Sequence, residues 1–136
     1  MATNSKNLHL LISAIVITIV ALTYGLSPAT NLPLVFDFKV ESTDLKGVFR
    51  AIMGLYLGMS GLWVAGIIKP FLWRTATIVN VYCMTGLATG RVIGLLFDGI
   101  PSMAFVIGLV FEIAFAIWGL RNLKEYPTSY KAVDNV

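Results

Sequence analysis

The chain has 136 residues, of which 57% are hydrophobic and 12% are charged, and its mean hydropathy is +0.83. A soluble domain of this length cannot bury so much apolar surface, so the composition predicts that lipid is the solvent. The net charge of +3 does not indicate nucleic acid as a partner, because the basic residues lie at the ends of apolar runs, where they anchor spans at the interface. We therefore expect a lipid bilayer as partner and no nucleic acid.

The first apolar run covers residues 8–26 and has 19 residues, enough to span a hydrocarbon core of about 30 Å. It is longer than the core of a signal peptide, which is roughly 7–15 residues. Ser27-Pro28-Ala29 loosely resembles a cleavage site, so retention of residues 1–29 stays open at this point. We expect this run to be kept as the first helix.

Residues 27–43 form the longest predicted loop, in which Pro28 and Pro33 argue against a continuous helix. Residues 36–41 alternate apolar and charged side chains, which is typical of an extended or surface-lying segment. We expect Phe36, Phe38 and Val40 to touch the membrane interface or to cap the bundle. The loop is too short to form a soluble ligand-binding domain.

The second helix is expected at about residues 44–68, with N-cap candidates at residues 42–44. Arg50 and three glycines share one face of it. Small residues at such spacing let two helix backbones approach closely, so we predict helix packing at Gly54, Gly58 and Gly61. The short turn at Lys69-Pro70 predicts a third helix antiparallel to the second.

The third helix is expected at about residues 71–97. At about 100° per residue, Asn80, Arg91 and Asp98 fall on nearly the same face. A face with an amide, a guanidinium and a carboxylate cannot look at lipid, so it must look at other helices, a partner or a wet cavity. Glycines repeat every four residues on this helix, and we predict packing at Gly86, Gly90 and Gly94.

The fourth helix is expected at about residues 102–123, after the turn at residues 98–101, with Ser102 as a plausible N-cap. Glu112 lies roughly ten residues, or ~15 Å, from its start. A polar tail follows at residues 124–136. The predicted fold is therefore all-α: a four-helix transmembrane bundle in a single integral membrane domain spanning residues 1–136.

Four spans place both termini on one side of the membrane. Basic residues are more frequent on that side than on the other, which predicts cytoplasmic termini in a bacterial inner membrane. Six lie on the side of the termini and three on the other, Arg91 not being counted: Lys6, Lys69, Arg74, Arg121, Lys124 and Lys131 against Lys39, Lys46 and Arg50.

The charged residues within the spans have overlapping depths. A charge near the membrane centre costs roughly 2.5–3.5 kcal/mol on insertion scales, and an opposite charge at the same depth relieves that cost. We expect Arg91 to pair with Glu112, with Arg50 near either acid and Asp98 placed to help. Tyr56 and Tyr82 lie deep enough to hydrogen-bond to this cluster.

Three interpretations of the cluster stay open. The charges could only fix helix register, although such polar contacts often contribute just ~0.6 kcal/mol. They could instead form a polar pocket or ion path, in which two arginines bind an anionic head group or carboxylate. The third interpretation is a docking surface for a larger membrane complex.

Enzymatic motifs are not apparent in the sequence. His9 and Cys83 are too far apart in depth to suggest a metal site, and there is no nucleotide loop and no nucleophile with a base. We expect no cofactor, no metal and no enzymatic activity.

Two stretches, residues 49–58 and 90–101, together with Glu112, resemble a family of small four-helix bacterial membrane proteins classed as a domain of unknown function. The layout is similar to that of DoxX-like membrane proteins. The resemblance implies a four-helix integral membrane fold and points to Arg50, Arg91, Asp98 and Glu112. It implies no activity.

The sequence therefore favours a non-enzymatic interaction or accessory subunit, which could self-associate through its glycine faces or join a larger membrane complex. The alternative is a protein that binds or carries a small molecule, an anion or a lipid in an Arg/Glu pocket. A closed ion-pair cluster would favour the first reading. An outward-opening cavity lined by Arg50, Arg91 and Glu112 would favour the second.

Overall fold

The computed structural model describes residues 3–127, and the regular structure within them is helical. Four of its helical segments are long and apolar enough to cross a membrane, so the chain is an all-α, multi-pass membrane protein, as predicted. Elements follow one another as α1 (Thr3–Gly25), α2 (Pro28–Val35), α3 (Thr43–Ile68), the 3₁₀ turn η1 (Pro70–Leu72), α4 (Trp73–Phe97) and α5 (Met103–Glu125). The predicted tail lies largely outside the described residues, which end at 127, and so does Lys131.

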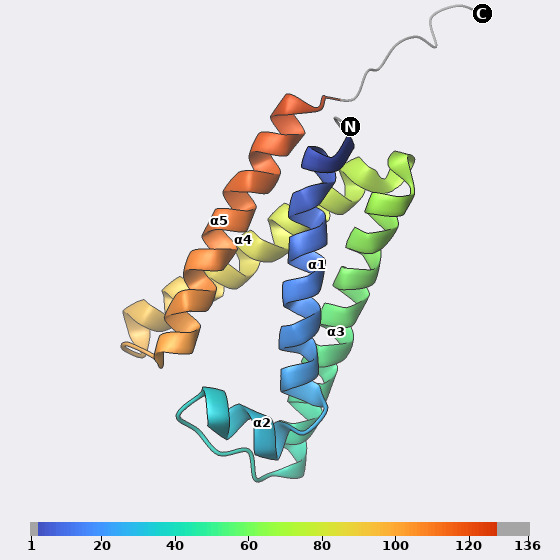
Figure 1. Ribbon diagram of the computed structural model, residues 1–136. Coiled ribbons are helices and arrows are strands. Elements are labelled where there is room, and N and C mark those ends of the chain that lie inside the picture. Colours follow the sequence, from blue (N-terminus) through green and yellow to red (C-terminus); the bar gives the residue numbers. More distant parts are fainter. Residues whose placement is uncertain (1–2, 128–136) are drawn as a thin grey trace, which may run out of the picture.

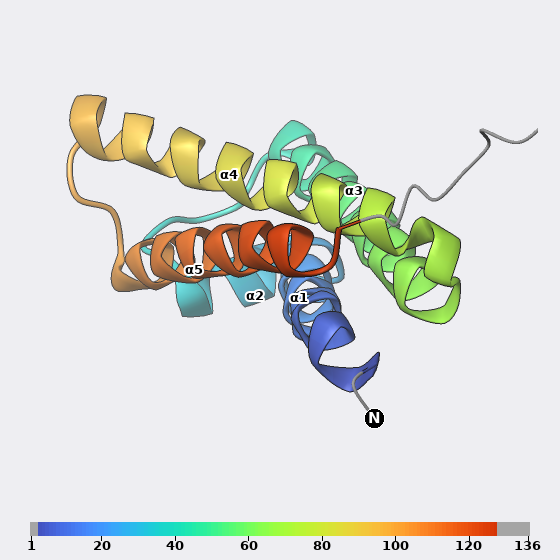
Figure 2. The ribbon, with the colours of Figure 1, turned by 90° about the horizontal axis from the view of Figure 1, so that it is seen from above.

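The spans associate as two pairs (Figure 1). Helix α1 packs most extensively against α3, and α4 packs most extensively against α5. Contacts between the pairs are fewer, and the far ends of α4 and α5 lie apart from those of α1 and α3 (Figure 1). Seen from above, α4 and α5 run side by side (Figure 2). A cavity described below lies between the pairs near this end of the bundle.

The start of α1 and the end of α5 lie at the same end of the bundle. The side-chain amide of Asn122 donates to the carbonyl oxygen of Lys6 at 3.3 Å and lies 3.0 Å from Nδ1 of His9. The indole N–H of Trp73 donates to the same carbonyl at 3.3 Å. These bonds tie α1, α4 and α5 together where the two pairs meet.

The segment predicted as a loop, residues 27–43, contains a helix, α2. Pro28 occupies its first turn, where the missing N–H costs nothing because that group has no partner inside a helix. Pro33 lies within α2, and the N–H of Phe36 bonds the carbonyl of Leu32 at 2.8 Å. Residues 27–43 thus form no continuous helix, as predicted, but they contain a helix of eight residues where the prediction had only a loop.

The segment after α2 caps the bundle, as one of the two sequence alternatives has it. Phe36 is buried, and its ring lies 4.4 Å from that of Phe105 on α5. Phe38 stacks on Phe36 and on Phe49 of α3, at 5.6 and 5.8 Å. This aromatic contact joins the two helix pairs at the end opposite the termini.

The predicted helix caps are confirmed in part. The hydroxyl of Ser42 accepts a hydrogen bond from the N–H of Leu45 at 3.1 Å, which closes the first turn of α3. Ser102 precedes α5 in the N-cap position, but its side chain forms no capping bond.

The predicted packing glycines do not form close helix contacts within the chain. A Cβ added at Gly54, Gly58, Gly61, Gly86 or Gly90 would meet nothing within 4 Å, and one at Gly94 would meet only the side chain of Asp98, at 3.7 Å.

The positions of these glycines on the helices explain why they make no close contact within the chain. At about 100° per residue, the α3 glycines lie opposite the buried face that carries Tyr56, Ser60 and Trp63. The α4 glycines border open space described below. The close approaches occur at Gly25, Gly66 and Gly119, where an added Cβ would overlap Met53, Ala76 and Val81 respectively.

This difference between glycines is testable with two matched substitutions. Gly66→Ala places a methyl group against the Cβ of Ala76 on α4, which cannot rotate away, so we expect a loss of about 1–3 kcal/mol of stability. Gly58→Ala meets open space and should change the stability little. Thermal unfolding in detergent measures both, and an equal loss in the two variants would contradict the described packing.

Candidate functional site

The structure contains the predicted pair between Arg91 of α4 and Glu112 of α5. Nε of Arg91 donates to both carboxylate oxygens, at 2.8 and 2.9 Å. The two side chains are 19% and 9% exposed, so the pair is shielded within the bundle. Within residues 3–127 no other salt bridge forms. A charge-assisted bond of this geometry is among the stronger polar contacts in proteins.

Two further residues of α5 lie against the guanidinium group of Arg91. Cζ of Arg91 lies 4.9 Å from the centre of the Phe105 ring, within the range of a cation–π contact. A Cβ at Gly108 would lie 3.2 Å from the same Cζ, so glycine there leaves room for the group. Phe105, Gly108 and Glu112 follow each other at spacings of three and four, on one face of α5. The sequence analysis missed Phe105 and Gly108, although this spacing before Glu112 was available to find them.

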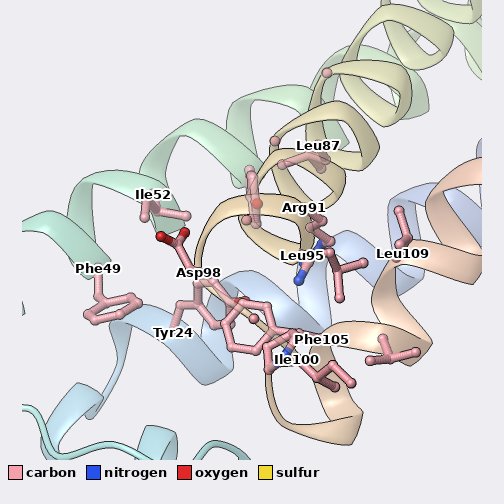
Figure 3. A pocket seen from close by; sticks show the side chains of 17 residues that line it. Tyr24, Phe49, Ile52, Leu87, Arg91, Leu95, Asp98, Ile100, Phe105 and Leu109 are labelled. Atoms are coloured by element: carbon pink, nitrogen blue, oxygen red, sulfur yellow. The ribbon is translucent and has the colours of Figure 1, made fainter.

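A first cavity of about 560 Å³ lies between the two helix pairs, with Arg91 in its wall (Figure 3). Its surface is mainly aliphatic and aromatic, with the phenols of Tyr24 and Tyr56 and the carboxylate of Asp98 as further polar groups. The lining comes from α1, α3, α4, α5 and the turn before α5. It comprises Tyr24, Phe49, Ile52, Tyr56, Gly86, Leu87, Gly90, Arg91, Gly94, Leu95, Asp98, Gly99, Ile100, Pro101, Phe105, Val106 and Leu109.

A second cavity of about 230 Å³ lies beyond the ion pair and is lined in part by Glu112 and Ser13. Tyr56, Leu87 and Arg91 contribute to both cavities, so Arg91 forms part of the wall between them. Ser13 is fully buried on α1, and its hydroxyl has no hydrogen-bond partner within the described part of the chain. The ion pair therefore borders two cavities and does not lie in a closed core.

The residues of the predicted polar face have different surroundings. Asp98 lines the first cavity at the end of α4 and is exposed. The turn after it is made by Gly99, whose φ of 100° is in the left-handed region that glycine adopts without strain. Asn80 is fully buried but lines neither cavity, and both polar atoms of its amide lack a partner within residues 3–127.

The structure does not bring Arg50 into the ion pair or into either cavity. Arg50 is exposed, lines neither cavity and forms no salt bridge with residues 3–127. On α3 it lies nearer to the outward glycine face than to buried Tyr56, so its side chain starts from the wrong side of the helix. Tyr82 is 76% exposed and lines neither cavity. Tyr56 is buried and lines both cavities together with Arg91.

No group of three or more His, Cys, Asp or Glu side chains within residues 3–127 is arranged to hold a metal ion. The polar groups of the two cavities are those of the ion pair, Asp98, Ser13 and the two tyrosines.

The comparisons with known proteins place the chain in a family. A family model described as "Domain of unknown function (DUF4345)" matches residues 5–121. The chain belongs to this family. The DUF4345 match covers most of the four spans and both members of the ion pair, in agreement with the resemblance to a membrane-protein family of unknown function. No curated protein and no solved structure matches the DUF4345 chain.

The ion pair can be tested by removing its members singly and together. Arg91→Met and Glu112→Met each leave one buried charge unpaired, which should cost about 3–5 kcal/mol. The double variant removes both charges, so we expect it to recover most of that loss. Unfolding in mixed micelles measures the three variants. A double variant as unstable as the sum of the single ones would contradict a direct pairing.

Proposed function

We propose that this protein binds a small amphiphilic molecule within the bilayer, in the first cavity, and does so without catalysing a reaction. The cavity volume of about 560 Å³ is the observation that carries the proposal, since sites for small molecules usually measure roughly 300–1,000 Å³. Such sites combine a mainly apolar wall with a few polar groups that orient the ligand. The wall with Arg91, Asp98 and two phenols has this character.

The anion-binding version of the proposal loses support. It required two arginines, and Arg50 lies outside the cavity. The remaining one, Arg91, already neutralises its charge against Glu112. We therefore propose a ligand with an apolar body and a polar end, rather than an anionic head group held between two guanidinium groups.

The direction of access follows from the distribution of charge. We propose a bacterial inner membrane with the start of α1 and the end of α5 in the cytoplasm. Lys6, Lys69, Arg74, Arg121 and Lys124 all belong to that end of the bundle. The end that carries Asp98 then faces outward, and the first cavity is reached from the outer leaflet.

Photoaffinity labelling tests the cavity directly. A long-chain alcohol carrying a diazirine, added to the protein in nanodiscs, should label lining residues such as Phe105 and Leu109 in a saturable way. Gly90→Phe fills open space in the cavity and should strongly reduce this labelling, whereas Val92→Phe on the exposed side of α4 should not. Uniform labelling of all lipid-facing residues, unchanged by Gly90→Phe, would contradict the proposal.

A second candidate function, that of an interaction or accessory subunit, is favoured by the outward face of α3. Gly54, Gly58 and Gly61 lie on this face with no atom within 4 Å of an added Cβ. Glycines at such spacing let a second helix approach closely in lipid. We propose a second copy of the chain as the occupant of this face, with another membrane protein as the alternative outcome.

Self-association can be measured by energy transfer between labelled copies in liposomes. Gly58→Leu puts a bulky side chain on the outward face and should abolish the transfer, whereas Val110→Leu at an exposed position of α5 should preserve it. Transfer that persists in Gly58→Leu, or is absent from the unmodified protein, would exclude a dimer through this face.

A further inference from the structure

The charges around the first cavity do not balance. Arg91 contributes one positive charge to the lining and shares it with Glu112 through two short hydrogen bonds. Asp98 contributes a negative charge to the same lining and forms no salt bridge with residues 3–127. Glu112 lies outside this lining but neutralises Arg91, so the carboxylate of Asp98 is left without a counter-charge in the lining.

The aromatic groups of the cavity, like the carboxylate of Asp98, attract positive charge. Four rings line it, those of Tyr24, Phe49, Tyr56 and Phe105. Tyr24 lies edge-on to Phe49 at 5.7 Å and beside Tyr56 at 6.1 Å, so three of the rings form one cluster. The faces of aromatic rings attract cations, and desolvated sites strengthen this attraction. Phe105 already holds the guanidinium of Arg91 in this manner.

The carboxylate and the ring cluster approach the cavity from opposite helix pairs. Asp98 follows the end of α4, whereas Tyr24 lies in the last turn of α1 and Phe49 lies near the start of α3. In Figure 3 the Asp98 carboxylate oxygens are directed toward Ile52 of α3, and the guanidinium of Arg91 lies elsewhere in the lining. A ligand between the pairs can thus contact the carboxylate and the rings at once.

We infer that the ligand of this cavity is a lipophilic organic cation, such as an ammonium or phosphonium group on an apolar body. The inference rests on the proposed binding function and specifies the charge of the ligand. Asp98 supplies the counter-charge, the rings contact the cationic centre, and the aliphatic wall holds the apolar body. A bare metal ion does not fit, because Asp98 is the one carboxylate in the lining and no metal-holding group of side chains occurs among the described residues.

Probes of one shape and different charge test the inference. Equilibrium dialysis against the protein in phosphatidylcholine nanodiscs, with empty nanodiscs subtracted, would compare tetraphenylphosphonium, tetraphenylborate and neutral triphenylphosphine oxide. We expect saturable binding of tetraphenylphosphonium with an affinity at least ten times that for the neutral probe. Tetraphenylborate should not bind saturably.

Variants of Asp98 locate the effect. Asp98→Asn should weaken tetraphenylphosphonium binding about tenfold and leave the neutral probe unchanged. Asp98→Glu keeps the charge and should retain binding, which guards against a folding defect in the amide variant. Asp37→Asn removes an exposed carboxylate that follows α2 and does not line the cavity, so it should have no effect.

The outcomes separate the two proposals. If all three probes bind equally, or tetraphenylborate binds best, the cavity binds ligands and the assignment of a cation is overturned. Unchanged tetraphenylphosphonium binding in Asp98→Asn also overturns it. If no probe binds saturably and the diazirine alcohol does not label the lining, the binding function fails with it.

Discussion

A guanidinium group in the hydrocarbon layer needs a counter-charge, and the site is organised around meeting that need. A lone charge at that depth costs several kcal/mol, and a carboxylate on the neighbouring helix at 2.8 Å offsets much of it. The arrangement of α4 and α5 in the structure brings Glu112, Phe105 and Gly108 together around the guanidinium of Arg91. The pair thus connects α4 and α5 and contributes a polar group to the wall of the first cavity.

The cavity follows from how the two helix pairs meet. They are joined by polar bonds of Lys6, His9, Trp73 and Asn122 at one end and by an aromatic contact after α2 at the other. The helix pairs separate from the first joint toward the second (Figure 1), and the glycines of α4 present no side chains to fill the space. The same ion pair that would be ordinary polar glue in a closed bundle thus borders open volume on both of its sides.

The sequence predicts much of this fold, because the spans, the depth of each charge and the faces of each helix follow from the residues of single segments. Lipid requires apolar helices of a fixed minimal length, so the four spans follow from hydropathy. The pairing of Arg91 with Glu112 follows from depth, since a charge must find its opposite at the same level. The shared face of Arg91 and Asp98 follows from the period of the helix, and both line the same cavity.

The rest depends on how helices are rotated about their axes, which the pattern of small and polar residues does not determine. Arg50 and Gly58 share a face that could pack inward by spacing alone, yet α3 buries Tyr56 and Trp63 instead. The close contacts are made by isolated glycines such as Gly66, which carry no repeat to mark them. Helix α2 was not predicted, because the prolines indicated a loop. A proline in the first turn is compatible with a short helix that begins there.

The direct contact between Arg91 and Glu112 in a lipid bilayer is the claim on which the account depends. Solid-state NMR can measure the dipolar coupling between ¹⁵N in the Arg91 side chain and ¹³C in the Glu112 carboxyl group of protein reconstituted in liposomes. The account predicts a coupling that corresponds to a hydrogen-bonded pair. No measurable coupling between these two groups, in a protein that is folded by every other signal, would contradict it.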